Sequence, residues 1–243
     1  MTIKTDSIYE STYEGNGAES ENAALKTVIE RLGGNAGSEL ISQAKPFIRL
    51  MTQYQCAMLE VKTKFEVLNA EMSLDSEKNP FESISCRLKK PASILDKLYR
   101  GGYEPTVENI EEHIRDVAGI RVICSFPDDI YMLADKLVAQ DDITLIQRKD
   151  YIASPKPNGY RSLHLIVGIP IFLSNEKKEM FVEVQMRTIA MDFWASLEHK
   201  LRYKKDIKDP AAISDKLREC AEQISDMDAR MQEIRDLIIE NKL

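Results

Sequence analysis

The stretch of sequence that decides the fold is DYIASPKPNGYRSLH, residues 150–164. Two prolines flank Lys156. Because each proline fixes its own φ at about −65° and favours extended geometry in the residue before it, Lys156 is predicted to lie on a stiff loop. The pair Asn158-Gly159 follows and supplies a turn that tolerates positive φ. The stretch therefore predicts a rigid loop that leads into a strand.

The residues beyond this turn alternate between polar and apolar, as in a strand with one buried face. The segment FVEVQMR, residues 181–187, alternates in the same way and has Glu183, Gln185 and Arg187 on its polar side. If the two strands pair with their polar sides aligned, those sides line one cleft. Taken alone, the first stretch is equally typical of an exposed hairpin arm. In the first strand the polar side is expected to carry Tyr160, Ser162 and His164, and the apolar side Leu163, Leu165 and Val167.

The rest of the chain predicts strands interleaved with helices, as in an α+β fold with a mixed sheet. Residues 1–45 are expected to form a polar tail with a possible short helix, residues 46–208 a central domain, and residues 209–243 a C-terminal helix used for assembly. Residues 81–90 are expected to form a basic approach to the following helix. Helices are expected at 22–32, 46–74, 91–100, 188–203 and 210–241. One further helix is expected to begin near residue 106, and another to begin after Pro127 and end near residue 140. Strands are expected at 117–125, 143–148, 163–172 and 181–187.

Two long helices carry apolar residues at steps of three and four, and such a stripe needs burial. We expect the two stripes to pack both against each other and against another subunit, which predicts a homo-oligomer. A third stripe, in the helix at 188–203, is interpreted as core. The stripes comprise Phe47, Met51, Tyr54, Met58, Val61, Phe65, Leu68 and Met72; Ile213, Leu217, Cys220, Ile224, Met227, Met231, Ile234 and Ile238; and Ile189, Phe193, Trp194, Leu197 and Leu201.

The composition predicts a soluble globular protein, with 43% hydrophobic and 30% charged residues. There is no long apolar run and no N-terminal secretory pattern, so no membrane association and a cytoplasmic location are expected. The four cysteines are scattered without CxxC spacing, which favours reduced thiols over a disulfide framework or a zinc site.

The net charge of −7 argues against a surface that binds nucleic acid throughout. The basic residues nevertheless form clusters, which suit a polyphosphate pocket or a partner surface. Solvated helix faces are the commonest reason for any one such cluster. The clusters are Arg87, Lys89, Lys90, Lys97 and Arg100; Arg148, Lys149, Lys156 and Arg161; and Lys200, Arg202, Lys204 and Lys205.

Three separated motifs, RDVAGIRV, KPNGYRSLH and EVQMRT, occur in this order. Together they resemble the synthetase domain of the RelA/SpoT family over residues 81–205, and the chain is similar to the small alarmone synthetases of the RelQ or RelP type. The resemblance implies a nucleotidyltransferase-like fold and a tetramer. It implies Mg²⁺-dependent transfer of pyrophosphate from ATP to the 3′-hydroxyl of GDP or GTP, with AMP as the leaving group and ppGpp or pppGpp as the product.

The resemblance also implies roles for particular residues. The ATP site would comprise Arg87, Lys89, Ser93, Lys97 and Arg121, and the GDP or GTP site Lys156, Asn158, Tyr160, His164 and Gln185, with Tyr160 stacked on the guanine. Asp116 would hold the Mg²⁺, and Glu183 would orient the 3′-hydroxyl, accept its proton or help to bind a second metal ion. Without the resemblance, the basic ATP-site residues are more typical of a solvated helix face. Strict alternation puts Asp116 and Arg121 on opposite faces, so either Asp116 precedes the strand or one role is wrong.

Alternative interpretations are a different nucleotidyltransferase, and a catalytically reduced module that binds single-stranded RNA. The carboxylates Asp116 and Glu183 disfavour the second, because they would repel a polyanion unless a cation bridges them. No His-Asp dipeptide occurs, so hydrolysis of the alarmone is not expected. Product activation is doubtful, because Ser83, Ser85 and Asp192 stand where the activated subgroup has Phe, Thr and Asn. His199 is interpreted as a structural histidine, and His113 is unassigned.

Overall fold

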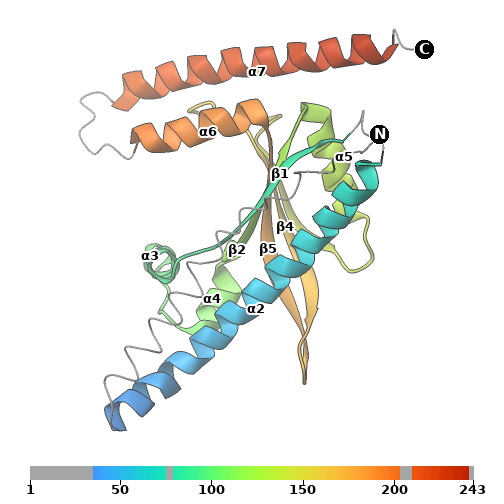
Figure 1. Ribbon diagram of the computed structural model, residues 1–243. Coiled ribbons are helices and arrows are strands. Elements are labelled where there is room, and N and C mark those ends of the chain that lie inside the picture. The colour runs from blue at the N-terminus through green and yellow to red at the C-terminus, as the bar shows by residue number, and fades with distance from the viewer. Residues whose placement is uncertain (1–34, 75–78, 203–209, 241–243) are drawn as a thin grey trace, which may run out of the picture. The chain divides into compact units, whose positions relative to one another are not determined.

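The computed structural model describes residues 35–74, 79–202 and 210–240 of the chain. Two compact units are present, Met1–Met51 and Thr52–Leu243. The described part of the first unit is the beginning of helix α2 (Asn35–Met72). The expected polar tail and the short helix at 22–32 lie outside the described residues. The second unit holds the other described elements (Figure 1).

A mixed sheet of five strands forms the centre of the second unit. In spatial order the strands are β1 (Phe81–Leu88), β2 (Ala118–Cys124), β5 (Lys177–Thr188), β4 (Leu163–Phe172) and β3 (Thr144–Asp150). Strands β2 and β5 run parallel, whereas the other neighbours are antiparallel. The predicted α+β fold with a mixed sheet is therefore confirmed.

Strand β1 was not predicted, because residues 81–90 were expected only as an approach to a helix. Within it, Ile84, Cys86 and Leu88 alternate with more exposed polar residues, so a strand signal was present. Its place at the edge of the sheet explains why the signal is weak, since an edge strand needs no strongly apolar face.

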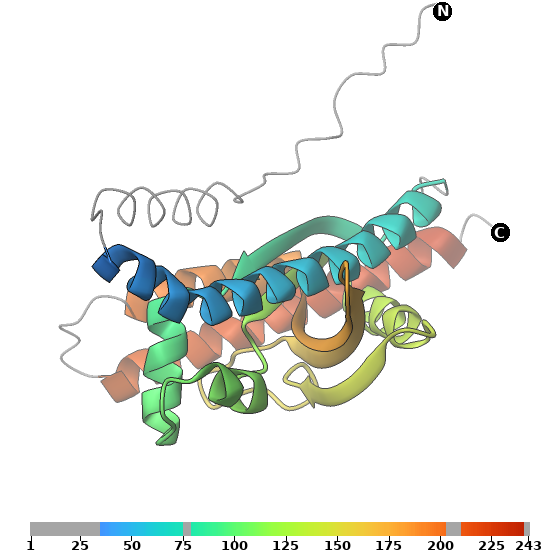
Figure 2. The ribbon, with the colours of Figure 1, turned by 90° about the horizontal axis from the view of Figure 1, so that it is seen from below.

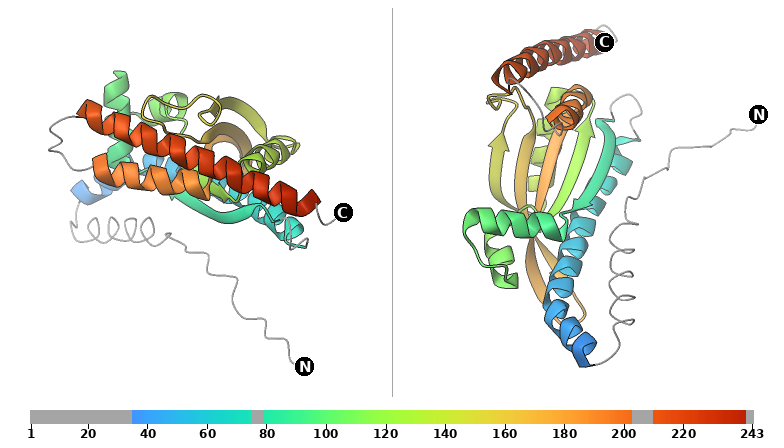
Figure 3. Two further views of the ribbon diagram at one scale, coloured as in Figure 1. Left: turned by 90° about the horizontal axis from the view of Figure 1, so that it is seen from above. Right: turned by 90° about the vertical axis from the view of Figure 1, so that its left-hand side faces the viewer.

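Helices connect and flank the strands, with bounds that follow ordinary start and stop signals. Pro91 opens α3 (Pro91–Gly101), and Gly102 closes it with a φ of 76°. The Thr106 side chain accepts a hydrogen bond from the Asn109 amide at 3.2 Å and so caps α4 (Val107–His113). Pro127 opens α5 (Pro127–Val138). Helix α6 (Ile189–Arg202) continues directly from β5, and α7 (Pro210–Glu240) lies along it (Figures 1 and 3).

The core lies on the apolar side of the central strands, where Val182, Val184 and Met186 of β5 are buried. Helix α5 adds the buried side chains Ile130, Leu133, Ala134 and Leu137. The α2 residues of the second unit add Tyr54, Val61 and Phe65, and the Phe65 ring meets the Phe81 ring edge-on at 6.2 Å between centroids. Figure 2 shows residues 52–72 of α2 crossing in front of the strands. The other side of the sheet is left to polar side chains.

Helix α2 begins at Asn35, so the expected start at Pro46 is wrong. Proline suits the first turn of a helix because it lacks an N–H group, which is why Pro46 was taken as the start. The residues before it contain several good helix formers, and a helix of 38 residues continues through the proline. An interior proline costs about 3 kcal/mol, which the many other contacts of a long helix can offset.

The other two stripes differ from expectation. Of the stripe residues in α6, Trp194 is buried, whereas Ile189, Phe193, Leu197 and Leu201 are exposed, so the interpretation of this stripe as core is wrong. In α7 the side that meets α6 carries Leu217, Ala221, Ile224 and the buried Asp228. The remaining stripe residues Met227, Met231, Ile234 and Ile238 are exposed. Helix α7 packs on α6 and, through Arg235 and Asp128, on α5, while these four stripe residues stay exposed.

The four cysteines, all of them within the described residues, are free thiols, as predicted. Among the helices that the structure describes, none has a stretch long and apolar enough to cross a lipid bilayer.

Candidate active site

The candidate site lies on the polar side of the sheet and is assembled by the strand register. Arg121 of β2 pairs with Ser85 of β1 and with Gln185 of β5, and Gln185 pairs in turn with His164 of β4. Because directly paired residues point to the same side of a sheet, these four side chains form one row across four strands. The neighbouring row contains Arg87, Gly119 and Glu183. Since Gly119 has no side chain, the space between Arg87 and Glu183 stays open.

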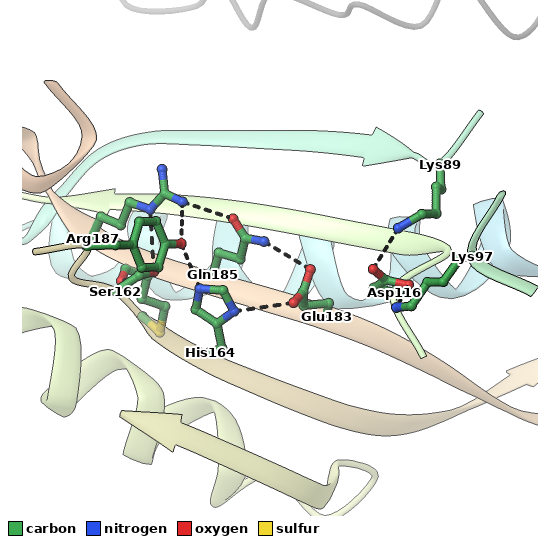
Figure 4. Close-up of polar contacts among 10 residues, drawn as sticks. Lys89, Lys97, Asp116, Ser162, His164, Glu183, Gln185 and Arg187 are labelled. Carbon is green, nitrogen blue, oxygen red and sulfur yellow. Dashed lines mark hydrogen bonds and ion pairs between the residues drawn. The ribbon is translucent and has the colours of Figure 1, made fainter. Parts of the chain in front are cut away.

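Asp116 stands at one end of this surface, two residues before β2 begins. Its two carboxylate oxygens accept hydrogen bonds from Lys89 at 2.7 Å and from Lys97 at 2.8 Å (Figure 4). Burial by itself would raise the pKa of Asp116, but the two ammonium groups outweigh burial and hold the pKa below its ordinary value. Asp116 is therefore ionised at neutral pH, held between one lysine that follows β1 and one from α3.

Glu183 occupies the middle of the surface and is held by two donors. His164 Nδ1 lies 3.3 Å from Glu183 Oε1, and Gln185 Nε2 donates to Glu183 Oε2 at 2.9 Å. Burial and the nearby charge of Asp116 act to raise the pKa of Glu183, but the contacts with His164 and Gln185 prevail and lower it. Glu183 is therefore ionised, and it lies close enough to Asp116 for the two charges to interact (Figure 4).

A series of polar contacts runs from Arg187 through Tyr160 and His164 to Glu183. Arg187 Nη2 donates to the Tyr160 hydroxyl at 2.6 Å, which lies 2.8 Å from His164 Nε2. The Tyr160 oxygen accepts from Arg187, and its other side meets His164 Nε2, while His164 Nδ1 faces Glu183. The buried Arg187 thus holds the Tyr160 hydroxyl against the ring whose other nitrogen contacts Glu183.

Arg187 and Asp192 are functional candidates that the sequence reasoning did not place in the site. Asp192 Oδ1, in the first turn of α6, accepts from Arg187 Nη1 at 3.0 Å and lies 3.5 Å from Arg121 Nη1. Strand alternation predicts that Arg187 lies on the polar side with Gln185, two residues before it, but alternation alone gave Arg187 no role in the site.

Arg121 is incompletely satisfied by the protein. Burial and the nearby Arg187 lower the pKa of the Arg121 guanidinium, and Asp192 only partly opposes them. Among the described residues, its buried Nε atom has no hydrogen-bond partner. An unpaired buried donor of this kind costs about 1–3 kcal/mol, and an anionic ligand would satisfy it.

The loop that precedes β4 carries two aromatic rings, those of Tyr151 and Tyr160, which together form an aromatic seat next to the hydrogen bonds of Arg187 and His164. The Lys156 ammonium lies 4.5 Å from the centre of the Tyr151 ring and 4.7 Å from the centre of the Tyr160 ring. Asn158 Oδ1 accepts from the Tyr160 amide at 3.2 Å, and Asn158 Nδ2 donates to Glu198 at 3.1 Å. Asn158 therefore shapes the turn, and Tyr160 is fixed at both its backbone and its hydroxyl.

Comparison with known proteins identifies this arrangement. Residues 86–208 match the region found in RelA / SpoT proteins. A GTP pyrophosphokinase of Bacillus subtilis, YwaC, is 45% identical over 182 residues, which cover 75% of this chain and 87% of that protein. A second, YjbM, is 37% identical over 191 residues, which cover 79% and 89%. This chain belongs to the RelA/SpoT family.

Solved structures of this family agree with the assignment. The crystal structure of small alarmone synthetase 1 from Bacillus subtilis, bound to its product pppGpp, matches with a TM-score of 0.73 at 36% identity and covers 80% of this chain and 98% of that one. Small alarmone synthetase 2 from the same organism matches with a TM-score of 0.70 at 42% identity and covers 78% and 98%.

The structure brings together most of the residues to which the RelA/SpoT resemblance gave roles. Lys89, Lys97 and Asp116 form one group, and Tyr160, His164, Glu183 and Gln185 form another. Arg87 and Arg121 share the polar side of the sheet through the strand register. Ser93 lies one helical turn before Lys97 on α3. Lys156 and Asn158 lie in the loop next to Tyr160.

Some expectations need correction. Asp116 precedes β2, so its position does not conflict with that of Arg121, and the first of the two alternatives holds. Ser162 lies on the polar side, as expected, but it is buried there: its hydroxyl donates to the Met186 carbonyl at 3.2 Å and accepts from Arg187 Nε at 3.4 Å (Figure 4). His199 is exposed and therefore has no packing role in the core. The unassigned His113 stacks on Tyr103 with 3.7 Å between the ring centroids.

The chemistry of Asp116 and Glu183 fits a magnesium ion. Both side chains are ionised, both offer oxygen ligands, and the charge of Asp116 acts on Glu183. Mg²⁺ is commonly bound through one or two carboxylates together with the phosphates of a substrate. The two lysines that now neutralise Asp116 would be free to contact those phosphates once a cation replaced them.

Proposed function

We propose that this chain is an alarmone synthetase, which transfers the β,γ-pyrophosphoryl group of ATP to the 3′-hydroxyl of GDP or GTP and releases AMP. The observation that carries the proposal is the arrangement on one sheet surface of two interacting carboxylates, each held by its own pair of donors. Asp116 is held by two lysine side chains whose charge suits a polyphosphate. Glu183 lies beside the aromatic seat, which suits the base of a nucleotide. The relatives named above are GTP pyrophosphokinases, which is in keeping with this assignment.

The donor nucleotide is proposed to bind at the side of Asp116. Lys89, Lys97 and Arg87 converge there from β1 and α3, and several convergent cations are what a polyphosphate needs. The unpaired Nε of Arg121 supplies a further donor, and Ser93 lies on α3 beside Lys97. A magnesium ion bound through Asp116 and Glu183 would neutralise developing charge on the transferred group.

The acceptor nucleotide is proposed to bind at the side of the loop. Tyr160 offers a ring on which guanine can stack, at low cost in side-chain entropy because its backbone and hydroxyl are already fixed. Lys156 would leave the aromatic seat to the base and contact the acceptor phosphates. His164, Gln185 and Asn158 complete this side of the site.

Glu183 is proposed to orient the 3′-hydroxyl. The pKa of Glu183 is lowered, so the carboxylate stays ionised and can accept a hydrogen bond from the 3′-hydroxyl, but it is a weak base. As the 3′-oxygen attacks the β-phosphorus of ATP, the bond from that phosphorus to the oxygen bridging the α- and β-phosphates breaks, and AMP leaves with that oxygen. The hydroxyl proton is released to solvent.

We further propose that the enzyme works as a closed homo-oligomer in a reducing compartment such as the cytoplasm. The exposed apolar residues of α6 and α7, among them Phe193, Met231 and Ile238, support assembly through these helices. The resemblance to small alarmone synthetases suggests a tetramer. Free thiols suit a reducing compartment. Binding of single-stranded RNA and the absence of product activation stay predictions.

The proposal is tested by incubating the purified protein with ATP, Mg²⁺ and either GDP or GTP, and separating the products by anion-exchange chromatography. Equal amounts of AMP and of a 3′-pyrophosphorylated guanosine nucleotide are expected. Formation of ADP, of free phosphate, or of no product with either acceptor would contradict it. Replacement of GTP by 3′-deoxy-GTP is the matched control, because it removes only the attacking hydroxyl and should stop AMP release.

A further inference from the structure

The C-terminal helix α7 touches the acceptor loop at one point, and the contact is unusually close. Gly159 has a φ of +88°, which an L side chain rarely adopts. A Cβ atom added there would also lie 2.5 Å from the Ala221 Cβ and 3.1 Å from the Arg218 Cα. Real Cβ atoms do not come as close as the first of these distances, so the turn of the loop packs directly on the Ala221 methyl group and the neighbouring backbone of α7.

Hydrogen bonds fasten the same contact. Arg161 Nη1 donates to the Gly159 carbonyl at 3.2 Å and to the Ala221 carbonyl at 3.3 Å, so one guanidinium ties the loop to the helix. Trp194 Nε1 of α6 donates to the Leu217 carbonyl at 2.9 Å and holds α7 one turn earlier. The helix is therefore fixed on both sides of the point where it meets the loop.

Ala221 also supports the ring of Tyr160. It is buried together with Trp194 and Ala195, and Tyr160, Leu217 and Ile224 pack against these three residues. The Tyr160 and Trp194 rings lie 6.5 Å apart between centroids. A larger side chain at position 221 would therefore push against Gly159 in the turn and against the packing behind Tyr160.

The other arm of the loop is not supported in this way. Beside this contact, a cavity of about 300 Å³ is lined by the loop residues Pro155, Lys156, Pro157, Gly159 and Arg161 and by Arg218 and Glu222 of α7. Helix α7 thus fixes the end of the loop that carries Tyr160, while the arm that carries Lys156 keeps room to move. A fixed Tyr160 end and a movable Lys156 arm suit a loop in which Lys156 must leave the aromatic seat before the guanine base can bind there.

We propose that Ala221 of α7 is a positioning residue for the acceptor site, acting through Gly159 and the packing behind Tyr160. This inference rests on the proposed function and goes beyond it, because it gives the C-terminal helix a part in acceptor binding that is separate from assembly. The donor side around Asp116 makes none of these contacts. A disturbance at Ala221 should therefore weaken binding of GDP or GTP and leave binding of ATP unchanged.

The test is Ala221→Leu, with Cys220→Leu as the matched control, because Cys220 is the adjacent residue and is exposed. Overpacking at a tight contact is expected to raise the KM for GDP about tenfold in Ala221→Leu. The KM for ATP should stay within about twofold of the wild type in both variants. Isothermal titration with GDP and with the non-hydrolysable ATP analogue AMPCPP should show the same division without turnover.

A second variant covers the possibility that Ala221→Leu does not fold, which thermal unfolding and the emission of the single Trp194 would reveal. Arg161→Lys keeps the charge but lacks the Nη1 group that donates to both carbonyls, and it should raise the KM for GDP in the same selective way. Unchanged GDP binding in folded Ala221→Leu, or equal losses for GDP and ATP in both variants, would overturn the inference. A wild type that makes no product and binds no guanine nucleotide would overturn the proposed function, and the inference with it.

Discussion

Replacement of Asp116 by asparagine tests the donor side of the site. The side chain accepts from both Lys89 and Lys97, and a hydrogen bond between charged groups contributes about 1.5–3 kcal/mol when it is shielded from water. The side chains of Lys97 and Asp116 are 40% and 22% exposed, so the Lys97 contact contributes little. Since asparagine keeps one acceptor oxygen, the free energy of unfolding should fall by only about 1–2 kcal/mol.

The effect of Asp116→Asn on catalysis should be far larger than its effect on stability. If the carboxylate holds the magnesium ion, its loss removes several kcal/mol of charge stabilisation and lowers the rate of AMP release roughly 10²- to 10⁴-fold. Asp135→Asn is the matched control, because Asp135 is an exposed carboxylate paired with Arg148 in the same unit. If folded Asp116→Asn forms product at the wild-type rate with Mg²⁺, the assignment of the metal site is refuted.

The stability effect of Asp116→Asn should also depend on pH. The lysines depress the pKa of Asp116 in the folded state, so its contribution to stability is present above the unfolded value of about 4 and is lost as pH falls through the folded value. The difference in unfolding free energy between the wild type and the variant should therefore shrink below about pH 4. A difference that is the same at pH 3 and pH 7 would show that the ion pairs do not stabilise the fold.

Three further predictions concern other parts of the molecule. Tyr160→Leu should weaken GDP binding about tenfold in a titration by losing a stacking energy of about 1–3 kcal/mol, and unchanged binding would exclude the stacking role. Burial and the charge of Asp128 raise the pKa of Asp129 to about 6, so the ionised form is disfavoured in the fold. Asp129→Asn should therefore gain stability over the wild type, by at most about 2–3 kcal/mol, as pH rises from about 4 to 7 in chemical unfolding, and a gain independent of pH would contradict this cause. Met231→Asp combined with Ile238→Asp should leave the fold intact and give a smaller species in light scattering, and an unchanged mass would remove these residues from the assembly surface.

The sequence determined the local features of the acceptor side. Alternation around His164 and Gln185 predicted two strands with polar sides aligned, and their direct pairing confirms it. The turn at Gly159 has the positive φ that its sequence predicts. These features could be predicted because strand periodicity and turn chemistry depend on neighbouring residues only. The α+β class followed from the order of such segments.

Tertiary structure decided which of these segments meet. Strand β1 gains its ladder from β2, a segment more than thirty residues away, so its own residues carried only a weak signal. Arg187 acquires its role from Tyr160 and Asp192, which lie on different elements. The exposed stripe of α6 reads as core in the sequence, because amphipathic spacing shows that a helix face needs burial but not which partner buries it. Contacts of this kind depend on strand order, register and helix placement, and these are fixed only when distant parts of the chain come together.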